Sequence, residues 1–200
     1  MREVLPGVLH WTTFHEGIGV RVSSYYVEPA GALIDPRMPD EGADWLAGRA
    51  RPQQVVLTSG LHVRHAAQFA DAFGCVVRAS PEALDRVGGN LDAELYRDGD
   101  EIAPGITALR IGALCPDEYA LHVAVAEGAI AFADALHSYG DEIGFFSDDL
   151  LGDDPAAVKA GLRDALRALL ARDFDHLLFA HGEPIIGGGK AVLRAFLRED

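Results

Sequence analysis

Hydrophobic and polar residues alternate through the first third of the chain in the manner of β-strands. Two segments, 8–14 (VLHWTTF) and 19–28 (GVRVSSYYVE), are rich in β-branched and aromatic residues. A third, 31–36 (GALIDP), is shorter and stops at Pro36. The Pro-Ala-Gly turn before it predicts that the last two segments pair as a hairpin.

The pattern changes after residue 40. The segment 40–49 (DEGADWLAGR) predicts a short helix, and 53–59 (QQVVLTS) predicts a strand. A helix is expected over 65–74, where Gly74 is placed to end it, and a strand follows at 75–79 (CVVRA). This strand–helix–strand order predicts one βαβ unit with parallel strands.

The second half repeats the order of strands followed by helices. Apolar runs predict strands at 105–112, 118–125, 128–136 and 176–182 and helices at 155–174 and 188–200. Within the first of these helices, five apolar residues fall on one face: Val158, Leu162, Ala165, Leu166 and Leu169. Two sets of strands with helices outside them predict an α/β fold, a four-layer αββα sandwich, in a single domain over residues 1–200.

Composition and charge exclude several classes of function. The formal net charge of −14 repels phosphate backbones, so nucleic-acid binding is disfavoured. No run of apolar residues is long enough for a membrane span, and the first residues do not resemble a signal peptide, so we expect a soluble, cytoplasmic protein without a membrane partner. Cys75 and Cys115 form no C-x-x-C pair and are expected to be buried, inert thiols.

Potential metal ligands stand near the ends of the predicted strands. His62 and His65 follow the first parallel strand, Asp134 lies near the end of an otherwise apolar strand, and His181 ends the strand over 176–182. Strand ends are where open sheets place their ligands. A carboxylate in apolar surroundings is unfavourable unless it is paired or bound to a metal, and imidazole with carboxylate suits zinc or iron.

Four segments, in order, resemble proteins of the metallo-β-lactamase fold. They are LPGVLHW with SSYYVEPAGALIDP, VVLTSGLHVRHAAQFADAFGCVVRAS, EYALHVAVAEGAIAFADAL and LLFAHGEP. The resemblance covers nearly the whole chain and implies the αββα sandwich. It also implies His62, His65, Asp134 and His181 as the metal ligands.

The metal motif departs from the pattern of that family, T-H-x-H-x-D-H. Arg64 stands in place of the aspartate, and the upstream histidine has no counterpart at 59–61. The turn that carries another histidine in the family, G-H-x-x-G-S, is GALCPDEYAL at 112–121. The resemblance therefore implies a reduced site, with either one zinc, iron or manganese ion or none.

Arg64 cannot be a metal ligand, because its guanidinium stays protonated. We hypothesise that Arg64 neutralises Asp134 in place of one metal ion, and that the remaining metal or Arg64 holds a developing oxyanion. Arg64 and Asp134 are therefore the expected catalytic residues. Asp35 is expected to order the loop around the site rather than to touch a metal. His10, His15, His122 and His176 are not expected to be ligands, and His137 is a weaker candidate for the mouth of the site.

Two functions follow from this site. The first is a metal-dependent hydrolase of a small ester, thioester or lactone. The alternative is a non-catalytic binding or regulatory module that has lost its metal. Both have a small molecule as substrate or ligand, while the charge argues against a nuclease.

Two other segments leave alternatives open. The acidic, aromatic segment 138–154 is either a lid over the site or an interface, and an exposed Phe145-Phe146 pair would favour a homodimer. The segment 182–190 (GEPIIGGGK) is not a P-loop. It is expected to be a turn before the last helix, with an anion-binding helix N-terminus as the weaker alternative.

Overall fold

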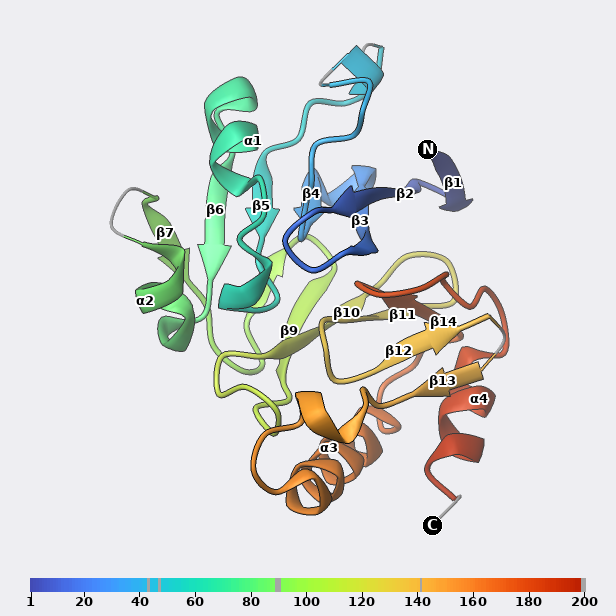
Figure 1. The fold of residues 1–200 in the computed structure, drawn as a ribbon. Helices are drawn as coiled ribbons and strands as arrows, with labels where there is room; N and C mark the ends of the chain where they lie inside the picture. The colour runs from blue at the N-terminus through green and yellow to red at the C-terminus, as the bar shows by residue number, and fades with distance from the viewer. Residues whose placement is uncertain (43, 47, 89–90, 141, 199–200) are drawn as a thin grey trace.

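Two β-sheets pack face to face in the computed structural model, which describes residues 1–42, 44–46, 48–88, 91–140 and 142–198 (Figure 1). Seven strands form the first sheet, in chain order: β1 (Arg2–Leu5), β2 (Val8–His15), β3 (Val20–Val27), β4 (Ala32–Ile34), β5 (Gln54–Val56), β6 (Val76–Ala79) and β7 (Ala93–Leu95). Five form the second, in spatial order: β14 (His176–Phe179), β11 (Ala129–Phe132), β10 (Tyr119–Val123), β9 (Ile106–Arg110) and β8 (Glu101–Ala103). A separate hairpin pairs β12 (His137–Tyr139) with β13 (Glu142–Gly144).

The helices are short except for α3. They are α1 (Ala66–Phe73), α2 (Leu84–Val87), α3 (Pro155–Leu169) and α4 (Gly189–Phe196). Single 3₁₀ turns complete the described elements: η1 (Glu28–Ala30), η2 (Asp44–Leu46), η3 (Gly60–His62), η4 (Pro81–Ala83) and η5 (Asp148–Leu150). No helix in the described ranges has both the length and the apolar character that a membrane span requires.

Strand pairing confirms the two supersecondary units that the sequence predicts. β3 pairs with β4 in antiparallel orientation across the turn at 28–31. β5 and β6 are parallel neighbours joined by α1, and Gly74 ends that helix with a left-handed φ of 65°. The first sheet is thus antiparallel at its start and parallel from β4 to β7.

Alternation of side chains along the strands produces the four layers. Tyr25 and Ile34 of the first sheet pack against Leu121 and Leu178 of the second to form the core between the sheets. The opposite face of the first sheet packs on α1, and its core includes Leu9, Tyr26, Leu33, Val55 and Phe69. The opposite face of the second sheet packs on α3 and α4, and its core includes Ile130, Leu177, Leu162, Leu166 and Leu193. The predicted αββα sandwich is confirmed.

Several expected boundaries need correction. The helix expected over 40–49 is a single turn at 44–46 in the described residues, and 43 and 47 lie outside them. Gly42 and Gly48 have φ values of 68° and 84°, which no α-helix accommodates. The helix expected over 155–174 ends at Leu169, because the chain turns there to place Asp175 beside Gly128. The strands β1, β7, β8, β12 and β13 were not predicted.

Candidate functional site

The site lies where strands of both sheets end. β11 and β14 are parallel neighbours in which Phe132 pairs with Phe179, so Asp134 and His181 each follow a strand end by two residues. β4 and β5 are also parallel, and Asp35 follows the first of them. His62 is the last residue of η3, the turn after β5. Segments far apart in the sequence thus meet at one edge of the sandwich.

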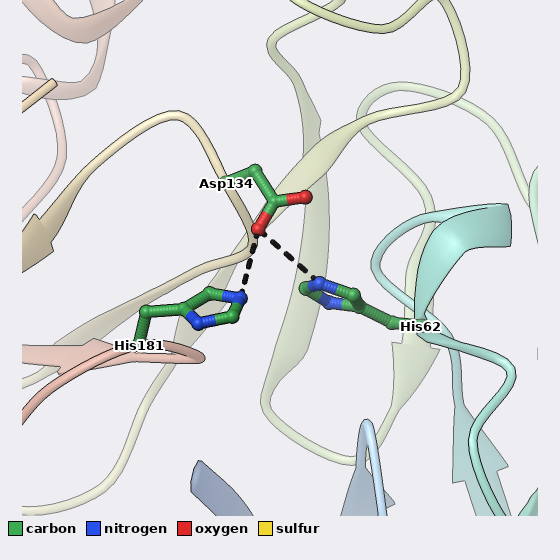
Figure 2. Close-up of side chains that lie close together, drawn as sticks. All are labelled: His62, Asp134 and His181. Carbon is green, nitrogen blue, oxygen red and sulfur yellow. Dashed lines mark ion pairs between the residues drawn. The ribbon is translucent and has the colours of Figure 1, made fainter. Parts of the chain in front are cut away.

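Three of the predicted ligands converge. Their ligand atoms, one each from His62, Asp134 and His181, all lie within 4.8 Å of one another. His62 Nε2 is 3.3 Å from Asp134 Oδ1, and His181 Nε2 is 3.2 Å from the same oxygen. Figure 2 shows both imidazole rings approaching this single carboxylate oxygen from two different segments. Two nitrogens and one oxygen therefore lie close enough together to bind one divalent cation.

Asp35 fixes the orientation of His62. The Nδ1 of His62 donates to Oδ2 of Asp35 at 2.8 Å, which leaves Nε2 toward Asp134. Asp35 is itself held by Thr58, whose backbone N–H donates to Oδ1 at 2.8 Å and whose hydroxyl donates to Oδ2. A carboxylate that holds the far nitrogen of a histidine is the usual support of a metal ligand.

The charges within the cluster depend strongly on one another. Burial disfavours the charged form of His62, but the carboxylates of Asp134 and Asp35 outweigh it and raise the pKa of His62 to about 9. Burial also opposes ionisation of Asp134, yet the two histidines hold the pKa of its carboxyl far below the usual range. At neutral pH and without a cation, an imidazolium therefore lies between two carboxylates.

Glu118 is a further acidic residue beside the cluster, which sequence reasoning missed. Its Oε1 accepts a hydrogen bond of 2.9 Å from the backbone N–H of Asp134, while its Oε2 is buried without a partner among the described residues. Burial and the neighbouring charge of Asp134 raise the pKa of Glu118 to about 8. The sequence signal was weak, because an acid at the start of a strand usually faces solvent.

The ligand atoms of His62, Asp134 and His181 suit a single metal cation. Asp134 Oδ1 is buried and accepts no hydrogen bond within the described structure, although two imidazole nitrogens lie 3.2 and 3.3 Å away. Both imidazoles therefore contact this oxygen as ion pairs, without the geometry of a hydrogen bond. A metal ion between these atoms would satisfy all three, and two imidazoles with one carboxylate is a common ligand set for zinc and iron.

His65 does not join the other three predicted ligands. Its Nδ1 accepts a hydrogen bond of 2.9 Å from the backbone N–H of Met38, and its own backbone N–H donates to the carbonyl of Pro36. His65 lies at the N-terminus of α1 and faces the segment after β4. The sequence placed it in the ligand set, but the structure gives it a role in joining these two segments.

Arg64 also differs from its expected position. Its guanidinium donates from one nitrogen to the carbonyls of Ser23 and Asp35, at 2.6 and 2.7 Å. Within the described ranges Asp134 forms ion pairs with His62 and His181, and Arg64 forms none. The expected direct neutralisation of Asp134 by Arg64 is therefore corrected: the two histidines take that place, while Arg64 acts at a longer range and helps to lower the pKa of Asp35.

The place of the missing upstream histidine is filled by an ion pair. The carboxylate of Asp117 accepts hydrogen bonds from Gly60 N at 2.6 Å, from Ser59 Oγ at 3.2 Å and from Arg86 at 3.1 Å. A Cβ at Gly60 would lie 2.9 Å from the Cβ of Arg86 and 3.0 Å from Asp117 Oδ2. This side of the site has no room for a larger side chain.

A cleft of about 560 Å³ opens onto the cluster. Asp134 and His181 contribute to its lining, and so does Cys115, which is half-buried rather than buried as expected. The remaining lining residues are apolar: Ile18, Val20, Leu61, Leu114, Phe146 and Leu150. The volume is typical of a small-molecule site.

The segment 138–154 forms one wall of this cleft. Phe146 lies against the ring of His181, with ring centroids 5.5 Å apart, and stacks on His137 on its other side at 4.5 Å. His137 is buried behind this wall, and burial together with His181 lowers the pKa of His137 to about 4. Phe145 packs on Phe196 of α4, so the expected exposed pair is half-buried, and a homodimer remains a prediction.

The glycine-rich segment before α4 forms the expected turn. Gly188 precedes the helix with a φ of 69°. Lys190 donates to the carbonyl of Arg172 and lies 5.2 Å from the ring centroid of Phe174. The ammonium group is thus directed at the end of α3. The backbone N–H groups of Gly187, Gly188 and Gly189 already donate to His176 and Asp175, so the chain itself occupies the helix N-terminus that the weaker alternative gave to an anion.

Comparisons with known proteins agree on the architecture. No protein-family model and no curated protein matches the sequence. Among solved structures, TMB-1 is 14% identical, with a TM-score of 0.70 over 99% of this chain and 96% of that one. A metallo-beta-lactamase from Erythrobacter litoralis is 17% identical, with a TM-score of 0.69 over 100% and 96% of the two chains. A metallo-beta-lactamase family protein from Thermus thermophilus is also 17% identical, with a TM-score of 0.68 over 98% and 80%. The chain therefore has the metallo-β-lactamase fold.

Proposed function

We propose that this protein is a metal-dependent hydrolase that cleaves a small ester, thioester or lactone with at most one metal ion. The observation that carries the proposal is the convergence of ligand atoms from His62, Asp134 and His181 within 4.8 Å, beside a cleft that Asp134 and His181 also line. Catalytic zinc sites commonly have three protein ligands and an open position toward the substrate.

Each residue of the site has its own role in this proposal. His62, Asp134 and His181 would hold a zinc, iron or manganese ion, which when bound lowers the pKa of water and polarises a carbonyl group. Asp35 keeps the Nε2 of His62 directed at the site. Glu118 orients Asp134 by accepting a hydrogen bond from the backbone N–H of Asp134. The apolar walls of the cleft exclude water from the reacting groups.

Arg64 takes a positioning role in this proposal. Its guanidinium is not part of the cleft lining, so it does not touch a substrate that occupies the cleft. Its hydrogen bond to the carbonyl of Asp35 instead fixes the segment that holds His62. This replaces the expected contact between Arg64 and an oxyanion.

The alternative function is a non-catalytic binding module, and one observation favours it. The raised pKa of His62, about 9, keeps its imidazole protonated at neutral pH while no cation is bound. Asp35 and Asp134 then already have a positive partner between them. A proton that is held this firmly competes with a metal ion for His62.

Elemental analysis and turnover together test the hydrolase proposal. The purified protein is expected to contain zinc, iron or manganese, or to gain thermal stability when one of them is added. It is also expected to hydrolyse members of a thioester and lactone panel, and His181→Ala should abolish this activity. His122→Ala is the matched control, because His122 lies on β10 outside the cleft lining, where its Nε2 contacts the carbonyl of Asp173.

Two results would contradict the proposal. One is the absence of bound metal together with no thermal shift on addition of any of the three ions. The other is an equal rate of hydrolysis by wild type and His181→Ala, which would place the activity elsewhere. The first of these results would favour the non-catalytic binding module that has lost its metal.

A further inference from the structure

The cleft beside the cluster is apolar along most of its lining. Ile18 and Val20 lie at the turn from β2 to β3, Leu61 lies in η3, and Leu150 lies in η5. These four side chains come from three separate segments and are 56%, 46%, 54% and 61% exposed. Large apolar side chains that are exposed together around one concavity are typical of a ligand site.

The charged residues of the cleft lining argue against an anionic ligand. Asp134 is the acidic residue and His181 the histidine among the lining residues, and no lysine or arginine belongs to the described lining. Arg64 donates to the carbonyls of Ser23 and Asp35, and Arg86 pairs with Asp117. The net charge of −14 further disfavours an anionic ligand. A substrate with a carboxylate or phosphate would find no lysine or arginine partner along the described lining of the cleft outside the cluster.

We infer that the cleft binds an uncharged alkyl or acyl chain, and that the substrate is a small ester, thioester or lactone whose acyl group is apolar. That the bound molecule is a substrate rests on the proposed hydrolase function. That the cleft binds an alkyl or acyl chain rests on the cleft alone. The cleft is continuous with Asp134 and His181, so a chain held by Leu61 and Leu150 brings a carbonyl at its end to the cluster.

Fluorescence of N-phenyl-1-naphthylamine, an uncharged apolar probe, tests the binding of such a chain without any turnover. The probe is expected to bind, and butan-1-ol, hexan-1-ol and octan-1-ol should displace it with increasing affinity. A fully buried methylene tightens binding about fourfold, and one at the open mouth tightens it less. Leu61→Asn and Leu150→Asn should each weaken probe binding at least fivefold.

Leu95→Asn is the matched control, because Leu95 is 43% exposed on β7 and does not line the cleft. Unchanged probe affinity in both cleft variants, or an equal loss in the control, would overturn the inference. A protein that is dimeric in sedimentation and becomes monomeric in Leu61→Asn would also overturn it, because the apolar residues would then form an interface between two copies.

An ester series separates this inference from the proposed function. If the protein hydrolyses acetyl, butanoyl and octanoyl esters of one alcohol, kcat/KM should rise with acyl length. Hydrolysis at equal rates, with no probe binding, overturns the apolar cleft and leaves the hydrolase standing. Graded alcohol binding with no hydrolysis of any ester supports the cleft and contradicts the hydrolase.

Discussion

The Nδ1 of His62 lies 2.8 Å from Oδ2 of Asp35, and this contact determines which nitrogen of the ring faces Asp134. Both side chains are buried, and Thr58 holds the carboxylate from the next strand end. The orientation of the proposed ligand nitrogen of His62 is therefore set by a carboxylate outside the proposed ligand set.

Asp35→Asn should weaken zinc binding about 10- to 100-fold, because the neutral amide no longer fixes the imidazole of His62. The affinity is measured by competition with a chelator at pH 9.5, where protonation of His62 no longer dominates. Asp164→Asn is the control, since Asp164 is exposed on α3 and pairs with Arg167. Equal affinities of wild type and Asp35→Asn would show that Asp35 does not support the site.

Zinc affinity should rise with pH, because the metal must displace a proton from His62. The pKa of His62 is raised to about 9 by Asp134 and Asp35 against the effect of burial. Below that pH, the apparent affinity is expected to increase about tenfold per pH unit. Isothermal titrations at pH 6.5, 7.5 and 8.5 measure this dependence, and a constant affinity over that range would mean that His62 does not bind the ion.

Glu118→Gln should remove part of the loss of stability between about pH 4.5 and pH 8. Burial and the charge of Asp134 raise the pKa of Glu118 from 4.5 to about 8, so the folded state retains a proton that the unfolded state has lost. Stability from this proton is complete below about pH 4.5 and falls by up to about 1.4 kcal/mol per pH unit until about pH 8.

Urea unfolding at pH 5, 6.5 and 8 measures the free energy of unfolding of both proteins. His62 loses its own stabilising proton as the pH rises from 6.5 toward 9, but wild type and variant share this effect. The difference in the free energy of unfolding between the two proteins is therefore informative. The variant should become more stable relative to wild type as the pH rises. A constant difference would mean that Glu118 is ionised throughout.

Gly60→Ala should destabilise the protein by about 1–3 kcal/mol, because a Cβ there would meet the Cβ of Arg86 at 2.9 Å. Gly144→Ala is the matched control, since its nearest side-chain neighbour, Tyr139, lies at an ordinary 3.5 Å. Thermal unfolding of both variants gives the comparison. If Gly60→Ala is no less stable than Gly144→Ala, the ion pair of Arg86 and Asp117 does not fill that side of the site.

The long elements of the fold could be predicted because their patterns are local. Alternation along β2 and β3 and the apolar face of α3 depend on neighbouring residues alone. β7, β8, β12 and β13 have three residues each, too few for a period to appear. β12 pairs with β13 and β8 with β9, each the next strand along the chain, and β7 pairs with the preceding strand β6. Their shortness, and not a distant partner, therefore kept them out of the prediction.

The candidate site was predictable where ligands follow strand ends in register. Asp134 and His181 could be paired because parallel strands end at the same edge, and β11 and β14 are such strands. His65 and Arg64 could not be placed in this way, because they lie in a turn where Arg64 has a φ of 44°. Glu118 and Asp117 were missed because their importance depends on burial, which becomes visible only once both sheets are assembled.

The central claim is that His62, Asp134 and His181 hold one metal ion. Calorimetric titration of the metal-free protein with zinc tests this claim most directly. The wild type is expected to bind one zinc ion per chain, and Asp134→Asn and His181→Ala are expected to lose this binding while they remain folded by circular dichroism. Two ions per chain, no binding, or binding that survives both substitutions would contradict the account.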